Sequence, residues 1–236
     1  MAATLRIPAR FNGPLHSGNG GYCAGAIASL ADEPVEVSLR RPVALETPLD
    51  VAEQPSGAIH VHEGDALVAL AEPSADLPLT APAPVDHATA ATAATGYRGS
   101  PDGEFSRCFV CGLSRDDALG VFAGAVEGRD VVASPWTPPA WAAGDSGVVA
   151  PEIVSAVLDC PTYFAAYLDT EVLVPSYLVR FATRIGGAVR AGVPHVVMAW
   201  PLSTQGRKRN AAAAVLSPEG EPLAVARALL VEPRAA

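Results

Sequence analysis

The sequence predicts an α+β fold in which one order of elements occurs twice. Each half of the chain contains a first strand, a turn rich in small residues, one apolar helix and then several strands. Between the halves, residues 73–104 are rich in Pro, Ala, Thr, Ser and Gly and show no sustained strand alternation. One helix followed by antiparallel strands is typical of a curved sheet that wraps a helix. The repetition indicates a duplicated unit.

The first half, residues 1–72, is predicted to hold its helix at 20–31. A strand at 4–11 and a loop at 12–18 precede this helix. The strands expected after the helix, each with apolar alternation or a short apolar run, are 35–43, 49–54, 58–62 and 66–71. Residues 73–104 form the linker, and residues 85–95 inside it are a candidate short helix.

The second half, residues 105–236, is longer and more regular. One or two strands are expected within 120–136, and the helix is expected at 151–168. The strands predicted to complete its sheet are 176–185, 195–202, 211–216 and 224–231. Two unrelated α+β domains are the alternative interpretation of the same pattern.

Composition restricts the classes of partner. Half of the 236 residues are hydrophobic and only 17% are charged, which is ample for a packed core. The net charge is −9, and the longest basic run is Arg207-Lys208-Arg209. A general nucleic-acid surface needs clustered cations to neutralise phosphates, so we expect no nucleic-acid partner. A small anionic ligand remains compatible with this composition.

The N-terminal segment and the cysteines indicate a cytoplasmic protein. Residues 1–10 include two arginines but no apolar signal segment, and no run approaches the roughly 18 apolar residues of a membrane span. In a reducing compartment the four cysteines stay as thiols, so we expect no disulfide. Cys108 and Cys111 have C-x-x-C spacing but supply only two of the four ligands of a structural zinc, so no metal is expected.

Several stretches carry a resemblance to a known family. Residues 147–165, together with 206–209 and 217–227, resemble acyl-CoA thioesterases of the hot-dog superfamily, most closely the double hot-dog type II enzymes. Residues 11–22 are similar to the loop-to-helix junction of an N-terminal hot-dog. The sequence Cys108-Phe-Val-Cys-Gly112, followed by Leu-Gly-Val-Phe at 119–122, is similar to a segment that often precedes the first strand in hot-dog proteins.

The resemblance implies a tandem (double) hot-dog, each half a curved antiparallel sheet wrapped around one central helix. It also implies a thioesterase that cleaves acyl-CoA or acyl-carrier thioesters between the two central helices. Neither a metal nor a cofactor is implied, and coenzyme A enters only as part of the substrate. Sheet edges left open by such a unit often associate further, so a homo-oligomer is expected.

The start of the first helix carries candidate substrate-binding groups. Thioester hydrolysis requires donors that polarise the carbonyl oxygen, and the free N–H groups and dipole of a helix N-terminus are such donors. Gly20 and Gly21 lie at this position and allow a substrate to approach closely. Asn19 is the natural N-cap, and its amide is also a candidate to orient water or the carbonyl. His16 is a candidate proton donor to the leaving thiolate, although a loop histidine commonly has a local role.

The second helix carries the candidate carboxylates. Pro151 favours the first helical position, and Glu152 and Asp159 lie seven residues apart on one face. Asp159 has apolar neighbours that raise its pKa, and by resemblance it matches the family's catalytic aspartate, acting as base or nucleophile. A carboxylate near Pro161 at a helix end is the structural alternative. Glu152 is a second catalytic candidate, although a dipole-complementing charge in the first turn also explains it.

The chain departs from the type II pattern in two places. Ser176 stands near the family's threonine, and the last strand, 224–231, has no glutamine, so the activation of water differs or is incomplete. Arg207, Lys208 and Arg209 are candidates to bind the phosphates of coenzyme A or of a carrier's phosphopantetheine. An ordinary solvated turn is the alternative interpretation of this basic run.

Two other functions compete with hydrolysis. A non-catalytic acyl-CoA or fatty-acyl binding protein would keep the pocket without complete catalysis, which fits the missing glutamine. A hot-dog dehydratase or hydratase would need a well-placed His/Asp pair, and no histidine lies on or beside the helix at 151–168. Hydrolysis is therefore the leading hypothesis.

Overall fold

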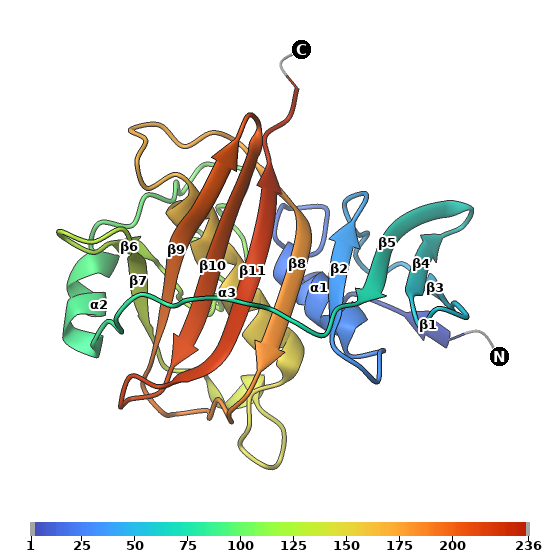
Figure 1. Ribbon diagram of the computed structural model, residues 1–236, viewed down its shortest axis with the longest axis horizontal. Coiled ribbons are helices and arrows are strands. Elements are labelled where there is room, and N and C mark those ends of the chain that lie inside the picture. Colours follow the sequence, from blue (N-terminus) through green and yellow to red (C-terminus); the bar gives the residue numbers. More distant parts are fainter. Residues whose placement is uncertain (1–2, 235–236) are drawn as a thin grey trace.

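The computed structural model describes residues 3–234 and contains one large antiparallel sheet (Figure 1). In the described part of the chain the sheet has eleven strands, in the order β1-β3-β4-β5-β2-β8-β11-β10-β9-β7-β6. Helices α1 and α3 pack against each other and against one face of this sheet. An α+β architecture with large curved strands is therefore confirmed.

The elements of the first half follow the predicted order. They are β1 (Ala3–Leu5), a 3₁₀ turn (Ala9–Phe11), α1 (Gly20–Ala28), β2 (Val35–Leu39), β3 (Leu49–Glu53), β4 (Ile59–Glu63) and β5 (Ala66–Pro73). The strand predicted at 4–11 is wrong beyond Leu5. Pro8 has no N–H for a strand ladder, and its carbonyl accepts from Phe11 N at 3.0 Å to close the 3₁₀ turn.

The linker and the second half also contain the expected kinds of element. They are α2 (His87–Ala94), β6 (Gly124–Ala125), β7 (Val132–Trp136), α3 (Pro151–Ala166), β8 (Tyr177–Ile185), β9 (His195–Gln205), β10 (Lys208–Leu216) and β11 (Pro222–Val231). Strands β9 and β10 extend further than predicted, to a tight turn at Gly206–Arg207. No helix within residues 3–234 has the length and apolar character to span a membrane.

The two halves of the sheet share one strand order. In the first half the order is β1-β3-β4-β5-β2, and in the second it is β7-β9-β10-β11-β8, with β6 added at the edge. In both, a helix follows the first strand, the first strand pairs with the third, and the second pairs with the last. The halves meet where β2 pairs with β8 between Val37 and Phe181, which makes the sheet continuous.

The linker crosses the face of the sheet opposite to α1 and α3 (Figure 1). Its start is held where Arg184 of β8 donates to the carbonyl of Ser74, and Pro84 lies against the β10–β11 turn at Gly220. Helix α2 then packs on β7 and β9. Strand β10 is buried on both faces, because Ala211, Ala213 and Val215 belong to the core that contains α3, whereas Ala212, Ala214 and Leu216 belong to a second cluster with residues of the linker and α2. This explains the continuous apolar run from Ala211 to Leu216.

The closest helix contact in the core joins α1 to α3. Gly21 and Gly25, one turn apart on α1, face the backbone of α3. A Cβ added at Gly21 would lie 2.6 Å from the carbonyl oxygen of Ser155, and one added at Gly25 would lie 2.8 Å from the Cα of Glu152. Side chains larger than hydrogen at these two positions would force the helices apart.

We expect Gly25→Ala to lower the free energy of unfolding by about 1–3 kcal/mol, the usual cost of overpacking a core. The methyl group would contact backbone atoms of α3, which cannot rotate away, and this outweighs the roughly 1 kcal/mol that alanine gains over glycine in a helix. Gly186→Ala is the matched control, because an added Cβ there meets nothing within 4 Å. Urea unfolding midpoints measure both, and equal midpoints would contradict the close-packing interpretation.

Candidate functional site

The buried carboxylate of Asp159 lies at the α1–α3 contact. Its side chain is only 8% exposed, and its Oδ2 accepts a hydrogen bond of 2.8 Å from the backbone N–H of Gly21, in the first turn of α1. Asp159 is well inside the 16-residue helix α3, which continues through Pro161. The helix-end position in the structural alternative is therefore wrong, although the carboxylate does accept a backbone hydrogen bond, and it faces the positive end of the α1 dipole.

Burial changes the acidity of this carboxyl group. Desolvation raises the pKa of Asp159 to about 7, as its apolar sequence neighbours predicted. The Gly21 N–H opposes this rise because it stabilises the charged form, and the nearby Cys108 adds to it. Near neutral pH the group is therefore able both to accept and to release a proton.

Asn19 connects the start of α1 to two sulfur atoms. Its Oδ1 accepts from Tyr22 N at 2.9 Å, which confirms the predicted N-cap. Its Nδ2 lies 3.8 Å from Cys108 Sγ and 3.7 Å from Cys160 Sγ, in hydrogen-bonding geometry. The side chain is buried, and its amide both caps α1 through the oxygen and contacts two cysteine sulfurs through the nitrogen.

The structure brings together some of the predicted site residues and separates others. Gly20 and Gly21 both lie against Asp159, and a Cβ at Gly20 would be 3.3 Å from its Oδ2. Glu152 is half-buried and lies about 10 Å further toward the start of α3, at seven residues of helical rise. His16 is exposed on the loop before α1.

Ser176 and Arg209 belong to a second polar cluster, at the other end of α3. The hydroxyl of Tyr167 lies 2.5 Å from Ser176 Oγ and donates to Glu232 Oε1 at 2.8 Å. Arg209 binds the same Glu232 oxygen at 3.0 Å and donates to the carbonyl of Ala166 at 2.9 Å. Tyr167 is eight residues beyond Asp159, about 12 Å along the helix axis. Arg209 therefore places a positive charge at the C-terminal end of α3 and binds one of its last carbonyl groups.

The other two basic residues lie on the surface. Arg207 and Lys208 are both exposed at the start of β10, and Arg207 donates to the backbone carbonyl of Glu232. Of the predicted phosphate-binding run, Arg207 and Lys208 present their charge to solvent, whereas Arg209 is occupied within the chain.

Sequence reasoning missed a cluster of three thiols beside this site. The sulfurs of Cys108, Cys111 and Cys160 all lie within 4.8 Å of one another, and those of Cys108 and Cys160 are 3.8 Å apart. Hydrogen bonds from the other two thiols hold the pKa of Cys108 well below its usual value. All four cysteines are free thiols. The sequence offered two signals, the C-x-x-C spacing of Cys108 and Cys111 and the position of Cys160 directly after Asp159.

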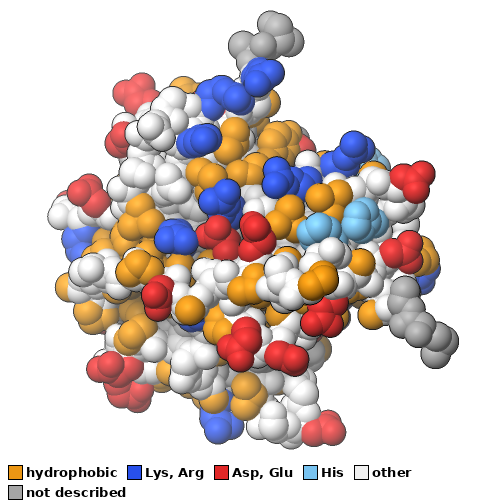
Figure 2. Space-filling view, turned by 45° about the vertical axis from the view of Figure 1, so that its right-hand side comes forward, with side chains coloured by type: hydrophobic (Ala, Val, Ile, Leu, Met, Phe, Trp, Pro, Cys, Tyr) orange, Lys and Arg blue, Asp and Glu red, His pale blue; other side chains and the backbone are white. Residues whose placement is uncertain are grey.

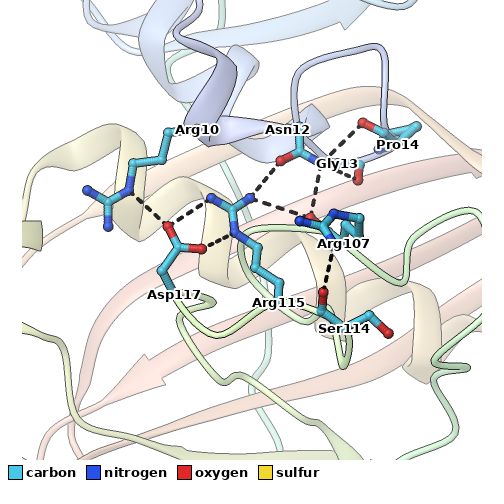
Figure 3. Close-up of polar contacts among 8 residues, drawn as sticks. All are labelled: Arg10, Asn12, Gly13, Pro14, Arg107, Ser114, Arg115 and Asp117. Atoms are coloured by element: carbon cyan, nitrogen blue, oxygen red, sulfur yellow. Dashed lines mark hydrogen bonds and ion pairs between the residues drawn. The ribbon is translucent and has the colours of Figure 1, made fainter.

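A polar clamp fixes the loop that carries Cys108 (Figure 3). Asn12 donates to the carbonyl of Arg107 at 3.0 Å and accepts from Arg115 Nη1 at 2.6 Å, and Arg115 also pairs with Asp117. The backbone carbonyl of Asn12 accepts from Phe109 N at 3.0 Å. These bonds join the loop before α1 to the loop before β6, so the two halves meet next to Asp159.

Two surface hollows lie elsewhere. One, of about 290 Å³, is lined by Glu36, Arg180, Asn210, Arg227 and Leu229 near the junction of β2 and β8. The other, of about 250 Å³, lies between the start of α2 and the β10–β11 turn. Neither has Asp159 or Gly21 in its lining. On the face shown in Figure 2, acidic and basic side chains are interspersed among apolar ones.

Comparison with solved structures identifies the fold. A tesB protein of Mycobacterium avium subsp. paratuberculosis superposes with a TM-score of 0.63 over 98% of this chain and 92% of its own, at 16% identity. A hot-dog protein of unknown function from Alicyclobacillus acidocaldarius gives a TM-score of 0.63 over 99% and 93%, at 11% identity. A candidate thioesterase from Novosphingobium aromaticivorans gives 0.62 over 98% and 95%, at 14% identity.

These matches show that the chain has the hot-dog fold, as the sequence resemblance implied. The similarity covers nearly the whole chain and is not limited to one half. No protein-family model matches the chain. No curated protein matches it in sequence either.

We expect Asn19→Ala to lower the free energy of unfolding by about 0.5–2 kcal/mol, because it removes the cap of α1. Asn19→Ser is the matched variant, since serine keeps a capping oxygen but cannot reach the two sulfurs. Chemical denaturation of both variants separates the two roles. If Asn19→Ser is destabilised as much as Asn19→Ala, the contacts of the amide with the two sulfurs, rather than the cap, stabilise the helix.

Proposed function

We propose that the chain is a thioesterase built as a tandem hot-dog, with units at residues 1–72 and 105–236 joined by a linker at 73–104. The shared strand order of the two halves supports this division, because each half has one helix placed after its first strand. The full-length similarity to a tesB protein and to a candidate thioesterase supports the reaction class.

The observation that carries this proposal is the contact between Asp159 and the first turn of α1. A buried carboxylate with a pKa near 7 is suited to general-base catalysis, and a helix N-terminus is suited to stabilise an oxyanion. The two groups come from different halves of the chain. Their meeting at one point supports a reaction site between the two central helices.

In the proposed reaction the N–H group of Gly20 at the start of α1 polarises the thioester carbonyl, whereas the N–H group of Gly21, which donates to Asp159 Oδ2, orients the carboxylate. On one route Asp159 takes a proton from the water that attacks the carbonyl carbon, the tetrahedral intermediate collapses with cleavage of the carbon–sulfur bond, and Asp159 returns the proton to the departing thiolate. On the other route the carboxylate of Asp159 attacks the carbonyl carbon, and the tetrahedral intermediate expels the thiolate, which takes a proton from solvent. Water then hydrolyses the resulting mixed anhydride, which releases the acid and restores the carboxylate. These steps require no cofactor, and coenzyme A or a carrier is part of the substrate.

The remaining predicted residues have subordinate places in this proposal. Arg207 and Lys208 are the exposed cations proposed to meet the phosphates of the substrate. Ser176 supports the end of α3 through Tyr167, and Arg209 supports it through the carbonyl of Ala166. Glu152 and His16 remain predictions, since Glu152 lies two helical turns from Asp159 and His16 is exposed.

Asp159→Asn should lower kcat/KM by about 10²–10⁴-fold, because the amide keeps the shape of the carboxyl but cannot accept a proton. Asp169→Asn is the control, since it removes an exposed carboxylate just beyond α3. The measurement is thiol release from short, medium, long and aromatic acyl-CoAs. Turnover of the Asp159 variant at the wild-type rate would contradict the proposed site.

The same substrate panel separates hydrolysis from simple binding. Calorimetric titration is run on each acyl-CoA alongside thiol release. Binding by the wild type without thiol release would favour the acyl-CoA binding protein, for which the absence of glutamine in β11 is the supporting observation. Turnover of any acyl class would support the thioesterase.

Arg207→Ala combined with Lys208→Ala should raise KM for acyl-CoA about tenfold with little change in kcat, as expected when two surface phosphate contacts of roughly 0.5–1 kcal/mol each are lost. The control substrate is the matching acyl thioester of N-acetylcysteamine, which has no phosphates, and its KM should stay unchanged. An equal rise in KM for both substrates would place the effect on the fold rather than on phosphate binding.

A further inference from the structure

The three thiols beside Asp159 have the spacing of a metal site. Cys108 and Cys111 lie in the same turn, which precedes β6 in the chain, and Cys160 lies in the middle of α3. Zinc–thiolate bonds of about 2.3 Å at tetrahedral angles place two sulfurs about 3.8 Å apart. The sulfurs of Cys108 and Cys160 are 3.8 Å apart, and all three lie within 4.8 Å of one another. A single ion is therefore able to contact all three with small side-chain rotations.

The backbone around Cys108 and Cys111 is held in the shape that brings their sulfurs together. Gly112 N donates to the carbonyl of Cys108 at 2.8 Å, which closes the turn. A Cβ at Gly112 would lie 2.6 Å from the carbonyl oxygens of both Cys108 and Ser106, so only glycine fits directly after the second cysteine. The clamp around Asn12 then fixes this turn against the first half of the chain.

The surroundings of the sulfurs also fit a thiolate cluster. Cys108 and Cys111 are buried and Cys160 is partly buried, so water competes weakly with a metal ion. The Nδ2 of Asn19 lies 3.8 and 3.7 Å from the sulfurs of Cys108 and Cys160. An N–H donor at this distance offsets negative charge on thiolates and orients the ligands.

We propose that Cys108, Cys111 and Cys160 bind one Zn²⁺ ion as thiolates, with a water molecule as the fourth ligand. Binding releases three thiol protons and leaves a site with a net charge of −1. Thiolate ligands in tetrahedral geometry select zinc over the harder Mg²⁺ and Ca²⁺. The ion would cross-link α3 to the turn before β6, beside the cap of α1, and so hold Asp159 in place against Gly21.

The test is the zinc content of the purified full-length chain, measured by mass spectrometry of the metal, before and after reconstitution with Zn²⁺ under reducing conditions. One zinc per chain is expected. Replacement by Co²⁺ should give the near-ultraviolet thiolate-to-cobalt absorption and the intense visible bands of a tetrahedral site. Cys111→Ser and Cys160→Ser should each lose the bound metal, and far-ultraviolet circular dichroism checks that they are folded.

Cys23→Ala is the matched control, because Cys23 is also buried but lies outside the three-sulfur cluster. It should keep one zinc per chain. A second readout needs no variant at all. When a mercurial reagent titrates the thiols of the wild-type protein, the bound zinc should be released.

Three results would overturn the proposal: wild-type protein that stays free of zinc after reconstitution, a Cys108–Cys160 disulfide that persists in protein purified under reducing conditions, or full zinc retention by both serine variants. None of these readouts uses a thioester. Asp159→Asn should keep its zinc while losing turnover, so a failure of the metal site and a failure of the thioesterase assignment are distinguishable.

Discussion

The contact on which the rest of the structure depends is the close approach of α1 to α3. Gly21 and Gly25 remove the side chains that would separate the two helices, so the backbone of α1 lies directly against that of α3. This proximity allows the Gly21 N–H to reach the carboxylate of Asp159 across the interface at 2.8 Å. Packing and the proposed chemistry therefore use the same contact, and a change that widens it would affect both.

The same contact explains how a buried carboxylate is tolerated. Burial penalises the charged form and raises the pKa of Asp159, whereas the amide and the positive end of the α1 dipole stabilise the charge. The balance leaves the group near the midpoint of its titration at neutral pH. A carboxylate in water would be a weaker base, and one buried without a donor would stay protonated.

Much of the fold follows from local sequence. The helices begin where Asn19 and Pro151 predict, because an N-cap and a first-turn proline act within a few residues. The duplicated order of elements was also visible, since apolar periodicity depends on neighbours along the chain. The first strand was predicted too long, because the apolar pattern continues past Pro8 while the backbone turns there.

The sequence by itself determined the elements, the glycine-rich start of α1 and the apolar setting of Asp159. Only the tertiary structure decided which side chains meet. It placed Ser176 and Arg209 with Tyr167 at the far end of α3, and it brought Cys160 next to Cys108, 52 residues earlier in the sequence, and next to Cys111. Such contacts depend on how helices and strands pack against one another. The spacing of residues along one helix or strand does not show which residues of another element will lie beside it.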